Sequence, residues 1–177
     1  MKRVIILCVA LLAFSLSAFA QDSHTGFWQL QGGYNNSNNA FDSGFMLSTG
    51  VGFKMSEHFD LGFNLGYWQG KQGGGFGDVN IMTFFVAPQY VNKFGNDNEF
   101  YALIGLGLAE HGSSTYDFGF YRYRLASETV WAGEAAAGIR HFFNDKVGLS
   151  FQLTYTHMDF NQTADVADGR IGVVVRW

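Results

Sequence analysis

The chain has 177 residues, with 11 Lys or Arg, 15 Asp or Glu and a formal net charge of -4. This length fits one domain, and an acidic chain is a poor partner for nucleic acid. A single cysteine excludes a disulfide framework, and His24, His58 and His141 lack the spacing of metal ligands, so we expect no metal and no cofactor.

The first 20 residues have the pattern of a secretory signal peptide. Lys2 and Arg3 precede the apolar run 4–12, and Ala18 and Ala20 are small residues placed three and one before a cut. The apolar run is shorter than the ~20 residues that a spanning helix needs, so we expect cleavage and not a retained anchor. This predicts a signal peptide at 1–20 and a mature domain at 21–177, whose net charge becomes -6 because two basic residues are removed from a chain of -4.

After residue 20, apolar residues recur at every second position in eight stretches, separated by segments rich in Gly, Asn, Asp and Ser. Because successive side chains of a strand point to opposite faces, this period predicts strands with one apolar face and one polar or small face. In the most regular stretch, Phe59 and Leu61 alternate with Asp60 and Gly62. In chain order, the predicted strands are 26–34, 44–55, 59–68, 80–91, 99–111, 129–142, 147–155 and 169–177.

The last predicted strand gives the strongest indication of architecture. Ile171 and Val173 fall on one face, Arg170 and Arg176 fall on the other, and the strand ends on Trp177. A soluble domain would leave this apolar strand as an exposed edge, whereas a barrel pairs its last strand with its first. Membrane strands need only ~9 to 11 residues, half of them apolar. The sequence therefore predicts an all-β fold, an eight-stranded antiparallel up-and-down transmembrane β-barrel.

The connections between the predicted strands alternate in length, and this alternation predicts an orientation. Bacterial outer-membrane barrels have short periplasmic turns and longer outer loops, so both termini should lie on the periplasmic side. The longer connections are 35–43, 69–79, 112–128 and 160–168, and the shorter ones are 56–58, 92–98 and 143–146.

Several segments of the chain together carry a resemblance to a known family. They are the signal peptide, Val86–Tyr90 (V-A-P-Q-Y), Tyr101–Leu108 (Y-A-L-I-G-L-G-L), Gly138–Phe143 (G-I-R-H-F-F) and the last residue, Trp177. Over the whole mature chain, the sequence resembles the small outer-membrane barrels of the OmpX and OmpA transmembrane-domain type, grouped as porin-family or outer-membrane β-barrel domains. The resemblance implies a place among the lipid and lipopolysaccharide of a Gram-negative-type outer membrane. It also implies delivery by the barrel-assembly machinery, which in that family recognises a signal that includes the terminal aromatic.

Polar residues of both signs occupy the inward faces of the predicted strands. Charges removed from water must be paired or hydrogen-bonded, and an eight-stranded barrel is just wide enough for its own side chains. We therefore expect a salt-bridged plug; the alternative is a selectivity ring around a narrow, porin-like channel or a path for a small ligand. The predicted lumen network consists of Lys54, Asp60, Asn64, Glu99, Glu134, Arg140, Gln152, Arg170 and Arg176.

The third long connection is rich in aromatic and Arg residues, which are enriched in binding hot spots. This pattern indicates a contact surface for an extracellular protein or surface ligand. The structural alternative is a protruding hairpin formed by the neighbouring strands, and both can hold because a protruding edge is itself a binding surface. The residues are Tyr116, Phe118, Phe120, Tyr121, Arg122, Tyr123 and Arg124.

Two groups of residues could suggest hydrolysis, because a Ser nucleophile needs a base and the base needs an orienting carboxylate. Lipid A 3-O-deacylases are also eight-stranded barrels, with a His-x-Ser pair near the outer leaflet. The first group lies near the third long connection, where a strand passes into a loop, and consists of Glu110, His111, Ser113 and Glu128. The second group consists of His157 and Asp159, so Asp stands where that family has Ser.

We therefore predict a monomeric, non-enzymatic barrel with a structural, surface-interaction or adhesion role that its extracellular loops carry. A narrow channel or small-ligand transport protein is the alternative, and a lipid A-modifying hydrolase is a more distant one.

Overall fold

The computed structural model describes residues 25–38, 43–71, 78–112, 114–117, 122–125, 127–160 and 163–177. The predicted signal peptide at 1–20 lies outside these residues. Within them, no helix has the length and hydropathy needed to cross a membrane.

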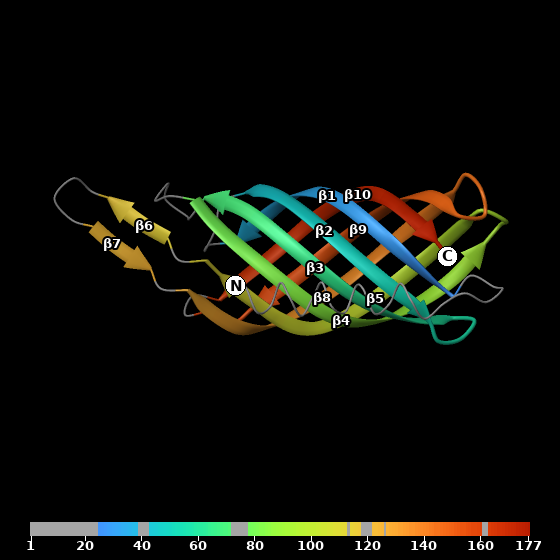
Figure 1. The fold of residues 1–177 in the computed structure, drawn as a ribbon, viewed down its shortest axis with the longest axis horizontal. Helices are drawn as coiled ribbons and strands as arrows, with labels where there is room; N and C mark the ends of the chain where they lie inside the picture. Colours follow the sequence, from blue (N-terminus) through green and yellow to red (C-terminus); the bar gives the residue numbers. More distant parts are fainter. Residues whose placement is uncertain are drawn as a thin grey trace.

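Eight antiparallel strands form a closed barrel, in the order β1-β10-β9-β8-β5-β4-β3-β2 (Figure 1). The predicted all-β, eight-stranded antiparallel barrel is confirmed. A separate two-stranded sheet pairs β6 (Ser114–Asp117) with β7 (Arg122–Leu125). The barrel strands are β1 (Gly26–Asn38), β2 (Gly44–Lys54), β3 (Phe59–Lys71), β4 (Asp78–Phe94), β5 (Asn98–His111), β8 (Glu128–Phe142), β9 (Val147–Met158) and β10 (Ala164–Arg176).

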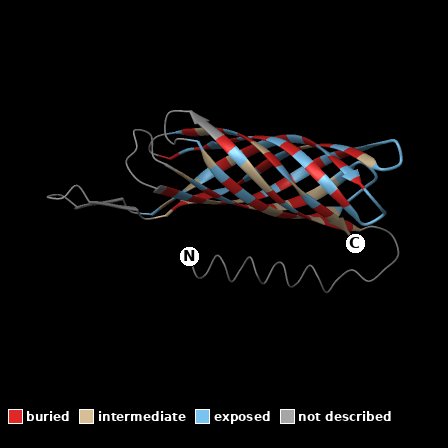
Figure 2. Ribbon diagram, turned by 90° about the horizontal axis from the view of Figure 1, so that it is seen from above, coloured by how far each residue is buried: buried red, intermediate tan, exposed pale blue. Residues whose placement is uncertain are grey.

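Buried and exposed residues alternate along the barrel strands (Figure 2), and many of the exposed residues are large and apolar. On β5, Ile104 and Leu106 are 70% and 72% exposed, whereas Arg140 on β8 is 1% exposed. The period of 2 explains this arrangement, because each strand presents alternate residues to the lumen and to the outside. An apolar outer wall is what a barrel in lipid requires.

β1 and β10 close the barrel. Their pairing runs from Phe27 opposite Arg176 to Asn38 opposite Asp165, so the last strand of the barrel is bonded to the first. The two backbones approach closely at Gly172, where a Cβ atom would overlap the backbone oxygen of Leu30. Glycine is therefore required at this position of the seam.

Short turns join the strands at one end of the barrel, which we call the short-turn end. The turn between β4 and β5 contains Gly95, whose φ of 70° favours glycine. In the turn after β8, the side-chain oxygen of Asn144 accepts hydrogen bonds from the backbone N–H groups of Lys146 and Val147, at 2.9 and 2.8 Å. The C-terminus lies at this end, and the opposite end is called the long-loop end (Figure 1).

The prediction of a loop at 160–168 was wrong for its last five residues, because β10 begins at Ala164 and pairs there with β1 and β9. Asp is depleted in strands, so Asp165 and Asp168 concealed the alternation. In the structure, the Asp165 carboxylate accepts hydrogen bonds on the outside of the barrel and the Asp168 carboxylate accepts them inside. Likewise, β1 continues through polar residues to Asn38 and not to residue 34.

Candidate functional site

The lumen near the long-loop end is packed with apolar side chains, which the prediction of a salt-bridged plug did not include. Trp68 and Phe85 lie on the inner face of the barrel and are 3% and 1% exposed. We call this set the apolar layer. Its members are Met46, Trp68, Val79, Ile81, Phe85, Ala109, Ala132, Met158, Phe160, Ala164 and Val166.

On the short-turn side of the apolar layer, a charged network is centred on Arg170. The guanidinium donates to both carboxylate oxygens of Asp168, from Nε at 2.5 Å and from Nη2 at 3.0 Å. Nη2 also donates to Glu134 at 3.3 Å, and the amide of Asn64 donates to the other oxygen of Glu134 at 3.3 Å. Because all four side chains are buried, these contacts replace the water that the charges have lost.

A second network lies nearer the short-turn end and is centred on Glu99. One oxygen of its carboxylate is 2.7 Å from Nη2 of Arg176, and the other is 3.7 Å from Nη1 of Arg140. The guanidinium carbon of Arg140 lies 3.8 Å from the centre of the Phe27 ring and 4.2 Å from that of the Tyr101 ring. The buried cation thus lies over two aromatic rings, a favourable arrangement for Arg.

Gln152 is buried in the lumen and makes two side-chain hydrogen bonds. Its oxygen accepts a hydrogen bond from the Tyr101 hydroxyl at 2.9 Å, and its amide donates to Thr154 at 2.9 Å. Of the nine residues of the predicted lumen network, six are buried, Asp60 and Arg176 are half-buried at the short-turn end, and Lys54 is exposed there. The six buried residues are Asn64, Glu99, Glu134, Arg140, Gln152 and Arg170.

Sequence reasoning missed one member of the Arg170 network, Asp168, because it assigned this residue to a loop. The sequence did indicate its position: Asp168 lies two residues before Arg170, so extending the alternation of the last strand toward the N-terminus would have placed its side chain in the lumen. The apolar layer gave a weaker signal, because some of its residues, such as Met46 and Phe85, stand between other apolar residues.

Trp177, the predicted assembly signal, is held to the first strand by its backbone. Its carbonyl accepts a hydrogen bond from the N–H of Thr25 at 2.8 Å, and its N–H donates to the carbonyl of Gly26 at 3.2 Å. Its role in assembly stays a prediction.

The predicted contact surface in the third long connection contains the separate sheet of β6 and β7. β5 and β8 pair up to His111 and Glu128, and the β6–β7 hairpin then extends past the end of the barrel (Figure 1). In this sheet Tyr116 is opposite Tyr123, and Arg124 is opposite Thr115. The remaining residues of the predicted surface, Phe118, Phe120 and Tyr121, lie outside the described residues.

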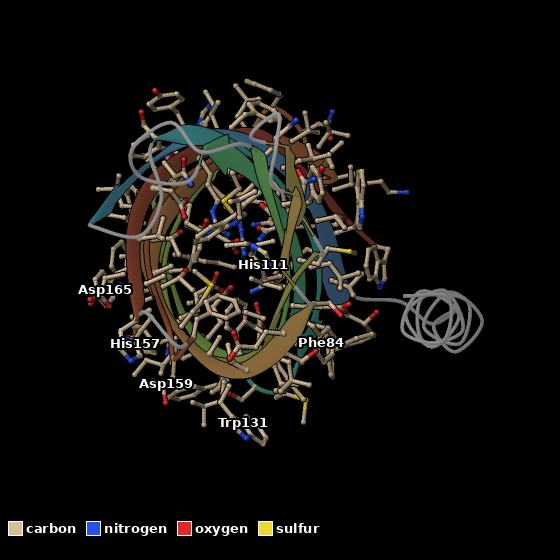
Figure 3. The ribbon with its side chains drawn as sticks, turned by 90° about the vertical axis from the view of Figure 1, so that its left-hand side faces the viewer. Phe84, His111, Trp131, His157, Asp159 and Asp165 are labelled. Atoms are coloured by element: carbon tan, nitrogen blue, oxygen red, sulfur yellow. The ribbon has the colours of Figure 1, made fainter. Side chains whose placement is uncertain are left out.

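The two groups considered for hydrolysis lie on opposite faces of the barrel wall. His111 is 8% exposed and points into the lumen, whereas His157 and Asp159 point outward (Figure 3). Outside, Nδ1 of His157 is 2.7 Å from the Asp165 carboxylate, to which the Tyr155 hydroxyl also donates at 2.8 Å. Ser113 lies outside the described residues. The structure therefore does not combine the two groups into one site.

Among the residues that the structure describes, no three or more His, Cys, Asp or Glu side chains are grouped so that they could hold a metal ion.

The comparisons with known proteins concern family and fold. The family model described as outer membrane protein beta-barrel domain matches residues 6–177. None of the curated protein sequences compared with the chain matches it.

Solved structures that share the fold at low sequence identity include the following three. Neisserial surface protein A is 14% identical, with a TM-score of 0.69 and coverage of 86% of this chain and 97% of that one. Ail, the attachment invasion locus protein of Yersinia pestis, is 12% identical, with a TM-score of 0.58 and coverage of 86% and 99%. The outer membrane enzyme PagL is 13% identical, with a TM-score of 0.55 and coverage of 83% and 98%.

Proposed function

Because the chain belongs to the outer membrane protein beta-barrel domain family and is thus a protein of the bacterial outer membrane, we propose that it acts there through its extracellular loops. Its role is to contact an extracellular protein or a surface ligand, while the barrel holds the loops in place. The fold alone does not determine this role, because Ail, the attachment invasion locus protein, and the outer membrane enzyme PagL share the fold.

The observation that carries the proposal is the β6–β7 hairpin. Its strands pair only with each other among the described residues, so each has an edge whose backbone groups can pair with another chain. Arg122, Tyr123 and Arg124 lie consecutively on one strand, and Arg and Tyr are the residue types most enriched in binding hot spots. An isolated hairpin of this length is marginally stable in water, so a partner that pairs with it would also stabilise it.

The filled lumen supports a role at the ends of the barrel and not along its axis. The apolar layer and the two charged networks occupy the inner face from the long-loop end to the short-turn end. An eight-stranded barrel leaves little room beyond its own side chains. This arrangement favours a structural barrel over a narrow channel.

The proposal is non-enzymatic, and it treats the pair of His157 and Asp165 as a polar contact of the outer wall. Nucleophilic catalysis requires a nucleophile, a base and an orienting group within hydrogen-bond reach of one another. His111 and His157 face opposite sides of the barrel wall, so neither histidine can take part in the candidate catalytic group of the other (Figure 3). The barrel itself is proposed to be a monomer surrounded by outer-membrane lipid and lipopolysaccharide, after insertion by the barrel-assembly machinery.

Truncating the polar and aromatic side chains of the hairpin should abolish surface adherence while leaving the barrel intact. The variant carries Tyr116→Ser, Arg122→Ser, Tyr123→Ser and Arg124→Ser, and adherence is measured with cells that display it, on heparin-coated and serum-protein-coated surfaces. Because hot-spot truncations cost ~2 kcal/mol or more each, we expect at least a tenfold decrease relative to wild type.

The matched control carries Asn96→Ser and Asp145→Ser, two exposed residues in turns at the other end of the barrel. It should adhere like wild type. Equal adherence of the wild type, the hairpin variant and cells without the protein on every surface would refute the proposed role.

A further inference from the structure

The positive charge of the hairpin is concentrated on β7. This strand carries Arg122 and Arg124, whereas β6 carries Asp117 and no basic residue. Among the described residues β7 pairs with β6 and with no other strand, so its second edge is open where the hairpin extends past the barrel (Figure 1). An open edge accepts a further strand through its backbone N–H and C=O groups, and the residues of the edge strand determine which strand fits.

The residues of β7 alternate in chemical character. Because successive residues of a strand occupy opposite faces, Arg122 and Arg124 share one face, and Tyr123 and Leu125 share the other. A strand added at the open edge would place a residue of its own opposite each of them. Acidic residues complement the arginines, and β-branched or aromatic residues complement Tyr123 and Leu125. The complementary strand therefore alternates acidic with apolar residues.

The register within the hairpin shows where an added acidic residue would matter most. Asp117 is opposite Arg122, so β6 already supplies an opposite charge at that position. Arg124 is opposite Thr115, which is uncharged. An acidic residue on an added strand would give Arg124 the cross-strand charge pair that β6 does not provide.

A second copy of the chain matches this edge poorly. Two β7 strands aligned antiparallel on Tyr123 would place Arg122 of each copy opposite Arg124 of the other, and like charges directly opposite destabilise a strand pair. β6 offers one acidic residue, Asp117, which is already opposite Arg122 in its own hairpin. The edge therefore favours a strand from a different protein.

We propose that the open edge of β7 binds an extended segment of an extracellular protein in which acidic residues alternate with β-branched or aromatic residues. The bound segment adds a third strand to a hairpin that is marginally stable by itself. This inference rests on the proposed role of the hairpin and defines the chemistry of its partner.

The test is the binding of fluorescent synthetic peptides to the full mature chain in lipid nanodiscs, measured by fluorescence anisotropy. A short peptide in which Val and Glu alternate should bind in a saturable way, and one in which Val and Lys alternate should not bind. Two control peptides should bind at least about fivefold more weakly than the Val–Glu peptide. One has the same composition with all Glu residues grouped together, and the other has methylated backbone nitrogens, which cannot donate hydrogen bonds.

Arg124→Glu places the variant on the side of the protein. It should bind the Val–Glu peptide about fivefold more weakly than wild type, because a favourable charge pair becomes a repulsive one. It should also bind the Val–Lys peptide more tightly than wild type does, a gain that requires a hairpin that still pairs. The control Lys146→Glu changes the net charge equally at an exposed residue of the short-turn end, and it should bind both peptides like wild type.

The inference is wrong if wild type does not bind the Val–Glu peptide, or if Arg124→Glu and Lys146→Glu bind it equally well. It is also wrong if the grouped or the methylated peptide binds as tightly, because charge alone would then explain binding, as for an anionic polysaccharide. If surface adherence depends on the hairpin while the Val–Glu peptide does not bind, the proposed role stands and the chemistry assigned to the partner is wrong.

Discussion

Replacing Arg170 with Met should lower the free energy of unfolding by about 3–5 kcal/mol, the range seen when one partner of a buried ion pair is removed. Arg170 is the cation that contacts both Asp168 and Glu134, and all three side chains are buried. Its loss leaves two carboxylates in the lumen without a counter-charge. The measurement is urea unfolding in lipid vesicles, followed by tryptophan fluorescence and by the shift in gel mobility between folded and unfolded barrel.

Two further variants separate the charge effect from a general effect of mutation. Lys54→Met removes an exposed cation and should change the free energy of unfolding by no more than about 0.5 kcal/mol. Combining Arg170→Met with Glu134→Gln and Asp168→Asn removes the unpaired charges and should recover much of the lost stability. If Arg170→Met is as stable as Lys54→Met, Arg170 does not hold the network together.

The second large effect is expected in the apolar layer. Phe85→Ala should lower the free energy of unfolding by about 3–5 kcal/mol, because it removes buried contacts and leaves a cavity that neighbouring side chains fill only in part. Phe85 is 1% exposed and belongs to the apolar layer. The same urea titration measures the loss.

Phe84 provides the matched control because it is the preceding residue of the same strand and points outward (Figure 3). Lipid chains can occupy the space that Phe84→Ala leaves, so this variant loses transfer free energy without gaining a fixed cavity, and its loss should be clearly smaller. Equal losses for the two variants would contradict a packed apolar layer inside the barrel.

The fold could be predicted from the sequence because the period of 2 is a local property. Alternation such as Phe59-Asp60-Leu61 defines a strand and its two faces without any knowledge of its neighbours. The ends of strands were less predictable where they extend beyond the apolar band. There, polar residues such as Asn35 and Asp165 continue the ladder, and their composition is typical of loops.

Part of the apolar layer could not be predicted, because some of its residues neighbour other apolar residues in the chain. Met46 lies between Phe45 and Leu47, and Phe85 follows Phe84, so no alternation marks the inner face at these positions. The pairing of charges across the lumen could not be predicted either. The contact of Glu99 with Arg176 joins β5 to β10, which are not neighbours in the barrel, and it depends on the stagger of all the strands.

Together, the networks and the apolar layer leave the two ends of the barrel as the places where function can reside. The long-loop end carries the β6–β7 hairpin, and the short-turn end carries a small cavity lined in part by charged side chains. This division rests on the central claim that the lumen is filled by its own side chains.

Planar-bilayer recording of the purified mature chain tests that claim most directly. With the apolar layer and both charged networks in place, no stable unitary currents should appear above the conductance of the bare bilayer. Stable and reproducible unitary currents from the folded, wild-type barrel would contradict the account and show that the lumen is a pore.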